Sequence, residues 1–282
     1  MRRRAFVALA ALVAAAGAGV AAGAAGPGGL GGLGGEAAPA PPPEFRILAA
    51  RVSPRHAYFA GRPVVLEFGL AAPDPLDLQI DIVRGRTDQP VRRLLLAAAQ
   101  PGVAQRVEWD GVTGGGKVAP DGGYRIRIRG ADGRVRRGGA FTLRSHSYPI
   151  PGPHVDRGAI GRFGVARNGG RRHNGFDVNS PCGTPIVAAR GGRVVRAGYD
   201  PVLHGNVMIV RGEKTRRDYW YSHLKNPVRL RVGDTVRTGQ RIGSIGDTGN
   251  ARTIGCHLHF EIHSRGRPID PAPELHAWDR WS

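Results

Sequence analysis

The amino-acid sequence predicts an all-β protein with two strand-rich domains. Apolar residues alternate with polar ones over short segments, as at Val64, Leu66 and Phe68, and this is the period of a strand with one buried face. Glycines bracket most of the strand-like segments in the C-terminal half, as tight turns between antiparallel strands require. Residues 44–143 contain no convincing helical pattern. Short strands joined by turns therefore account for both halves of the chain.

Residues 1–25 have the organisation of a secretory signal. Three arginines follow Met1, an apolar run covers residues 5–13, and Ala22-Gly23-Ala24 offers a cleavage site of small residues. If the signal is cleaved, we expect a secreted or cell-wall-associated protein. If it is not cleaved, it would anchor the chain in the membrane. No other segment is apolar for long enough to span a bilayer. The sequence therefore predicts an extracytoplasmic protein.

Residues 26–43 are rich first in glycine and then in proline. Glycine gives a linker flexibility and proline gives it an extended stiffness, so we expect a spacer between the signal and the folded domains.

Residues 44–144 are predicted to form a β-sandwich of about 100 residues, because several short strands are separated by turn signals. Two segments, RVEWDG at 106–111 and VAPDGGY at 118–124, resemble the immunoglobulin-like domain of flagellar hook-cap type. The resemblance implies a spacer or wall-docking module. We expect Trp109 to anchor its core rather than to stack on a sugar. Residues 145–168, with three prolines, are predicted to be a linker and lead-in.

The most informative motif of the chain is His257-Leu258-His259, which lies within the predicted C-terminal domain of residues 169–275. In a strand the two histidines share one face, and Leu258 points to the other face, into a core. His173 and Asp177 are spaced so that an extended segment also places both on one face. These four residues predict a metal site.

Another histidine, His223, lies in a further aromatic and apolar segment between these motifs. A catalytic zinc site takes three nitrogen or oxygen ligands and leaves one position for water or substrate. The chain offers more than three candidate ligands, and a purely structural zinc site does not need additional histidines beside the metal. The surplus therefore favours catalysis.

Residues 146–273 resemble the lysostaphin/LytM-type zinc peptidases, which cut peptidoglycan cross-bridges. The resemblance is carried by RHNGFD (172–177), GTPIVAA (183–189), YSHL (221–224), VGDTV (232–236) and GCHLHFEI (255–262). It implies a β-sheet-dominated domain with an open groove and one Zn²⁺ per chain. It also implies that His173, Asp177 and His259 bind the zinc, and that His257 and His223 handle protons and transition-state charge. Residues 276–282 are predicted to be a tail.

Two neighbouring side chains leave alternatives open. Tyr221 lies two residues before His223, so we expect it to share that strand face and to donate to a developing oxyanion. Packing in the core is the alternative. Glu261 is expected to lie beside the site or on the surface rather than to act as a general base, because the resemblance gives it no such role.

Cys182 and Cys256 are the only cysteines. One follows Asp177 by five residues and the other precedes His259 by three, so a shared metal would bring the cysteines close together. In an exported protein we expect a disulfide. The alternative is that a thiolate binds the metal.

The net charge of +19 comes almost entirely from arginine, since the chain has 41 basic and 22 acidic residues and only three of the basic ones are lysine. Such a surface favours polyanions, and for an exported protein we expect anionic wall polymers rather than nucleic acid. The alternative is a solvated, arginine-rich surface without a specific binding patch. The arginine runs have no interleaved aromatic residues for base stacking.

These observations predict an exported zinc metalloendopeptidase, a monomer, that hydrolyses peptide bonds in peptidoglycan stem peptides or cross-bridges. One alternative is a non-catalytic module that binds the cell wall or activates an amidase. Relatives of that kind often lack a ligand, whereas this chain keeps all of them, which favours the enzyme. A structural polyanion-binding protein would leave the histidines unexplained.

Overall fold

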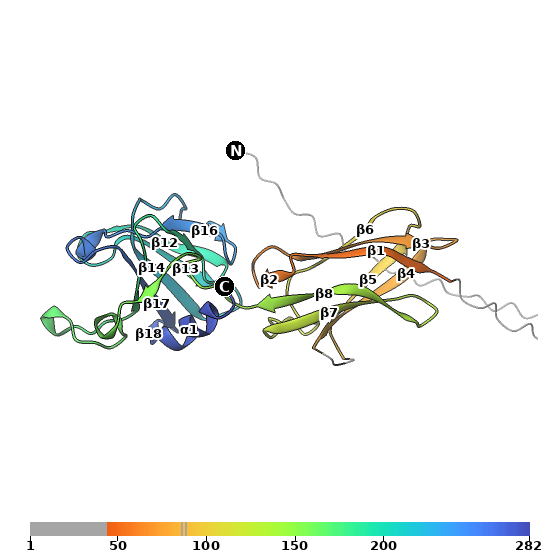
Figure 1. Ribbon diagram of the computed structural model, residues 1–282, viewed down its shortest axis with the longest axis horizontal. Coiled ribbons are helices and arrows are strands. Elements are labelled where there is room, and N and C mark those ends of the chain that lie inside the picture. The colour runs from red at the N-terminus through yellow and green to blue at the C-terminus, as the bar shows by residue number, and fades with distance from the viewer. Residues whose placement is uncertain (1–43, 86, 88) are drawn as a thin grey trace, which may run out of the picture. The chain divides into compact units, whose positions relative to one another are not determined.

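The computed structural model describes residues 44–85, 87 and 89–282 (Figure 1). The predicted signal at residues 1–25 and the predicted linker at 26–43 lie outside this part of the chain. Strands dominate the described residues, which confirms the predicted all-β class. Within them, no helix is long and apolar enough to cross a membrane.

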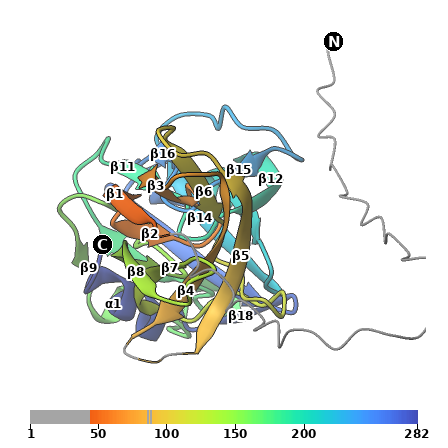
Figure 2. The same ribbon diagram turned by 90° about the vertical axis from the view of Figure 1, so that its right-hand side faces the viewer.

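The first strands form a two-sheet sandwich. One sheet contains β1 (Arg46–Ser53), β3 (Val64–Ala71) and β6 (Gln105–Trp109). The order in the other sheet is β2 (His56–Tyr58), β8 (Val135–Arg144), β7 (Gly122–Arg129), β4 (Leu76–Arg84) and β5 (Pro90–Ala99) (Figure 2). Both sheets bury apolar side chains in one cluster, including Leu66 and Ile80. The hook-cap resemblance of this sandwich stays a prediction.

Trp109 lies in that cluster with 3% of its surface exposed. Its ring contacts Tyr124 and Phe141, and its indole N–H donates to the carbonyl of Val112. The predicted role as a core anchor is confirmed.

The C-terminal part is built on a larger antiparallel sheet of its own. Its order is β15 (Thr235–Val236), β12 (Gly192–Asp200), β13 (Gly205–Gly212), β14 (Arg217–Leu224), β17 (His257–Ser264), β10 (Phe176–Asn179) and β9 (Val155–Asp156), and β18 (Arg267–Ile269) also pairs with β17. A smaller sheet pairs β11 (Pro185–Val187) with β16 (Arg241–Ser244). Three single 3₁₀ turns are η1 (Ala159–Gly161), η2 (Asn168–Gly170) and η3 (Gly249–Ala251).

Helix α1 (Ala272–Asp279) crosses the predicted domain end at residue 275. Leu275 and Trp278 are buried in the same core cluster as Phe260 of β17. The prediction of a tail from residue 276 was therefore wrong. Eight residues behind a proline are too few to show a clear helical period.

His146 precedes this second core and couples its stability to pH. The ring stacks on Trp278, with centroids 4.4 Å apart, and its Nε2 lies 2.7 Å from the Tyr219 hydroxyl. Burial, helped by the charges of Arg190 and Arg217, lowers the pKa of His146 from 6.5 to about 3. Between these values the unfolded chain binds a proton that the folded chain excludes, so stability falls as pH falls.

We expect the His146→Gln variant, which cannot titrate at this position, to show a flatter dependence of unfolding free energy on pH. Between pH 7.5 and pH 5 the natural chain should lose about 2 kcal/mol more than the variant, at roughly 1.4 kcal/mol per pH unit below 6.5. Denaturant unfolding followed by tryptophan fluorescence measures both curves. Parallel curves would show that His146 titrates normally in the folded state.

Candidate metal centre

Strand β17 carries the centre on one of its faces. Leu258, Phe260 and Ile262 point into the core, which leaves the alternate residues on the opposite face. Pairing in antiparallel register sets Asp177 of β10 opposite His259, and Ser222 of β14 opposite the same histidine. The sheet therefore brings segments that are more than 80 residues apart in the sequence to one point.

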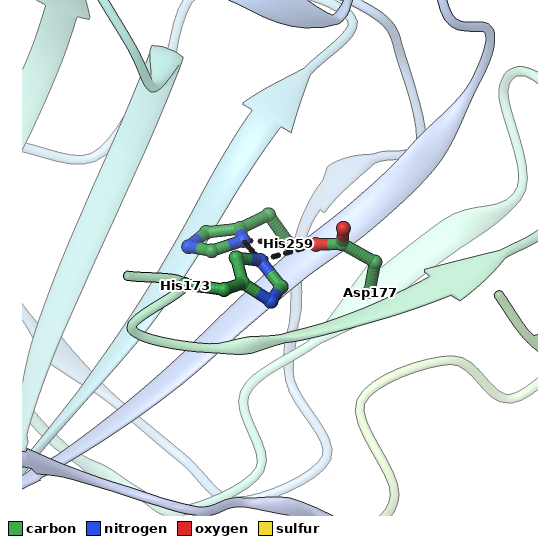
Figure 3. Close-up of side chains that lie close together, drawn as sticks. All are labelled: His173, Asp177 and His259. Carbon is green, nitrogen blue, oxygen red and sulfur yellow. Dashed lines mark hydrogen bonds and ion pairs between the residues drawn. The ribbon is translucent and has the colours of Figure 1, made fainter. Parts of the chain in front are cut away.

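Three side chains converge there (Figure 3). His259 Nδ1 lies 2.9 Å from His173 Nε2 and 2.9 Å from Asp177 Oδ1, and the last two atoms are 3.1 Å apart. Around a tetrahedral zinc with bonds of 2.0–2.1 Å, donor atoms are about 3.3 Å apart. All three residues are buried, and their two nitrogens and one carboxylate oxygen are donors that zinc prefers. The triad therefore fits a zinc ion.

The glycine between the first two ligands allows this convergence. A Cβ at Gly175 would lie 2.5 Å from the carbonyl oxygen of Phe260 and 2.8 Å from His259 Cε1. Only a residue without a side chain lets the segment before β10 approach β17 so closely.

Hydrogen bonds to the backbone fix the tautomer of three histidines. The Nδ1 atoms of His173, His223 and His257 each lie 2.8 Å from a carbonyl oxygen, those of Arg162, Thr248 and Gly255 respectively. A carbonyl only accepts, so each Nδ1 carries the hydrogen and each neutral ring keeps an unprotonated Nε2. That nitrogen is the ligand atom of His173, and in the other two histidines it is a proton acceptor.

In its neutral form His259 has the opposite tautomer, because Glu261 lies on its other side. Its Nε2 is 2.7 Å from a carboxylate oxygen of Glu261, which leaves Nδ1 free for a metal. The second oxygen of Glu261 bonds to Nε2 of His263. A carboxylate on the far nitrogen of a ligating histidine orients the ring and raises its basicity. Glu261 thus lies beside the site, and the alternative of a surface position is excluded because only 3% of its surface is exposed.

The charges of the site match these roles. Burial opposes the ionised form of Asp177, but its contacts with the imidazoles of His173 and His259 prevail and hold its pKa well below the usual range. Burial likewise opposes charge on His259, yet Asp177 and Glu261 raise its pKa to about 9. The two carboxylates therefore stabilise positive charge where the ligand atoms meet.

His223 and His257 lie beside this triad, and both are neutral. Burial lowers the pKa of His223 to about 3, with contributions from His259 and His257. Burial also lowers the pKa of His257, against a hydrogen bond to Gly255. Their rings pack with centroids 4.8 Å apart. Both residues line a groove of about 1020 Å³ together with the triad.

Tyr221 does not reach this groove. It is fully buried in the core, and its hydroxyl accepts a hydrogen bond from the Ala189 amide. The expectation that it shares a face with His223 was wrong, because the pleat breaks at the end of β14, where His223 has a φ of 61°. This left-handed residue turns His223 to the face of Ser222 and away from that of Tyr221.

The structure contains the predicted disulfide between Cys182 and Cys256. The bond ties the segment after β10 to the start of β17, next to the ligand-bearing strand pair. With both sulfur atoms in the disulfide, the alternative of a thiolate ligand is excluded.

His204 was missed by the sequence analysis. Its Nδ1 lies 2.9 Å from the Ser222 hydroxyl, and its ring centroid is 5.8 Å from that of His259. Donor atoms of His204, His259 and Glu261 all lie within 4.8 Å of one another. His204 belongs to none of the motifs. The only signal in the sequence that points to it is its residue type.

Comparison with known proteins finds a match over the segment that carries these residues. Residues 171–271 match the family model described as Peptidase family M23. The chain is 39% identical over 98 residues to the peptidoglycan DD-endopeptidase ShyA of Vibrio cholerae, covering 35% of this chain and 22% of the relative. It is 35% identical over 118 residues to the murein hydrolase activator NlpD of Salmonella typhimurium, covering 42% of this chain and 29% of the relative. The match thus spans less than a third of the length of each of these relatives.

Among solved structures, the catalytic domain of lysostaphin from Staphylococcus simulans is 31% identical, with a TM-score of 0.36, over 47% of this chain and 92% of that one. The sequence match alone covers the zinc-ligand candidates and both neighbouring histidines. Residues 171–271 therefore form a peptidase M23 domain.

Proposed function

We propose that the protein is an exported zinc metalloendopeptidase that hydrolyses peptide bonds in peptidoglycan. The observation that carries this proposal is the second pair of histidines. His223 and His257 are held neutral beside the ligand triad, with their Nε2 atoms unprotonated, and a module that only binds its target does not need them. A peptidoglycan hydrolase among the relatives supports the choice of substrate.

The residues suggest a division of labour in hydrolysis. His173, Asp177 and His259 would hold one Zn²⁺, which supplies Lewis acidity for the scissile carbonyl and the attacking water. An unprotonated Nε2 of His223 or His257 accepts the proton of that water and returns it to the leaving amine. Their backbone hydrogen bonds keep each ring in the tautomer that this transfer requires.

Digestion of purified peptidoglycan tests the proposal. We expect the zinc-loaded protein to release new amino groups and to change the muropeptide masses, and a chelator to abolish both effects. The His257→Ala variant is the control for a contaminating hydrolase. Masses unchanged by the zinc-loaded protein would contradict the proposal.

The second candidate is an activator of another peptidoglycan hydrolase, since one relative is named as a murein hydrolase activator. It predicts no digestion by the protein alone. It also predicts that the His257→Ala variant stimulates a partner hydrolase as well as the natural chain does. Extracytoplasmic location and anionic wall polymers as binding partners remain part of either proposal.

A further inference from the structure

The groove over the centre has an excess of positive side chains. Four arginines line it, at positions 157, 167, 171 and 172. The only carboxylates in the lining are Asp177 and Glu261, and both are already bonded to histidines of the centre. A bound zinc ion would add further positive charge. The groove is therefore suited to an anionic ligand.

Arg157 differs from Arg167, another arginine of the groove, in its hydrogen-bond partners. Its side chain is half-buried, and its two terminal nitrogens donate to the side-chain oxygen of Asn179, at 3.1 Å, and to the carbonyl of Ile254, at 2.7 Å. Neither acceptor is charged, and among the described residues no carboxylate forms an ion pair with Arg157. By contrast, Arg167 has Asp177 Oδ2 at 3.5 Å.

The guanidinium of Arg157 is also placed next to the proposed chemistry. Asn179, its side-chain partner, pairs in register with His257. The two bonds above use two of the five N–H donors of a guanidinium, whose planar fork matches a carboxylate.

We propose that Arg157 binds a free carboxylate of the substrate next to the scissile amide. The substrate class is then a cross-linked peptide that carries an ionised carboxylate on a residue next to the scissile amide. Cross-links without that group, such as glycine bridges or peptides with a carboxamide in its place, are poor substrates. This inference rests on the proposed peptidase function.

Two synthetic cross-linked peptides that differ only in this group test it, one with the carboxylate and one with the carboxamide. We expect the zinc-loaded natural chain to cleave the carboxylate form about 10-fold to 100-fold faster in kcat/KM, as a charge-assisted hydrogen bond in a partly buried site allows. In Arg157→Met the ratio should fall to about one, and Arg157→Lys should keep part of it.

The ratio of kcat/KM for the two peptides is measured with one preparation of each variant. A smaller fraction of folded or zinc-loaded protein in Arg157→Met lowers both values equally and leaves their ratio unchanged. The matched control is Arg193→Met, because Arg193 also donates to a backbone carbonyl, that of Gly233, but does not line the groove. This variant should keep the full preference. Equal cleavage of the two peptides by the natural chain, or an undiminished preference in Arg157→Met, would overturn the inference.

Binding separates this inference from the proposed function. If the natural chain cleaves neither peptide, the peptidase proposal fails, and fluorescence anisotropy with the same peptides, labelled, decides on the subsite. Tighter binding of the carboxylate form that disappears in Arg157→Met supports the subsite. Equal binding of both forms overturns it.

Discussion

Replacing His259 with alanine should remove the zinc and the activity together. The variant keeps only two of the three donor atoms that meet at one point, His173 Nε2 and Asp177 Oδ1. Losing even an outer partner of a ligand costs 10-fold to 100-fold in metal affinity, so loss of the ligand itself should cost at least about 100-fold. Metal analysis after dialysis should find close to one zinc per natural chain and almost none per variant chain.

His257→Ala should separate the two properties that His259→Ala loses together. Its Nε2 is 4.0 Å from the carboxylate of Asp177 and it is not one of the three converging donors. We expect this variant to keep its zinc and to lose about 10²-fold to 10⁴-fold in turnover, the usual contribution of a general acid or base.

His276→Ala is the matched control, since His276 lies on α1 in an exposed hydrogen bond with Asp156 and should affect neither zinc nor turnover. Loss of zinc in His257→Ala, with His259→Ala still loaded, would reverse the assignment of the two histidines.

The strand that carries the centre could be predicted because its pattern is local. Successive side chains of a strand point to opposite faces, so the sequence of residues 257–262 is enough to predict which of them face the core. The structure places Leu258 and Phe260 there. Proximity of the two cysteines likewise followed from their short distance in the sequence to the expected ligands. Each of these inferences needs only the period of a strand and one shared metal.

The features that could not be predicted depend on backbone irregularity or on contacts between distant segments. The left-handed backbone at His223 breaks the strand period, and no local pattern marks that position. His204 and Arg157 belong to loop and edge segments that reach the groove only once the sheet has formed. Their roles depend on neighbours far away in the sequence, such as Ser222 for His204.

Gly175→Ala should weaken both the fold and the metal site, although the change adds only one methyl group. The new Cβ would lie 2.5 Å from the Phe260 carbonyl oxygen, 2.8 Å from His259 Cε1 and 2.9 Å from Glu261 Cγ. The first of these atoms belongs to the backbone of β17 and cannot rotate away. The start of β10 must therefore move off β17 and carry His173 and Asp177 with it.

We expect a loss of about 1–3 kcal/mol in the free energy of unfolding, as overpacking of a tight site usually costs. Zinc affinity should fall at least about tenfold, because a ligand set tolerates little displacement. Denaturant unfolding of the metal-free protein and competition with a zinc chelator measure the two effects separately.

Gly198→Ala provides the control for replacing a glycine within the same sheet. Gly198 lies in β12, and a Cβ there would meet nothing within 4 Å. Alanine should be neutral or slightly stabilising at that position, since glycine weakens a strand interior by roughly 0.5–1 kcal/mol. Gly175→Ala could instead have the same zinc affinity and unfolding free energy as Gly198→Ala. That result would contradict the prediction, because it would show that β10 and β17 can accommodate a methyl group between them. The position of the triad would then depend on the side-chain hydrogen bonds alone.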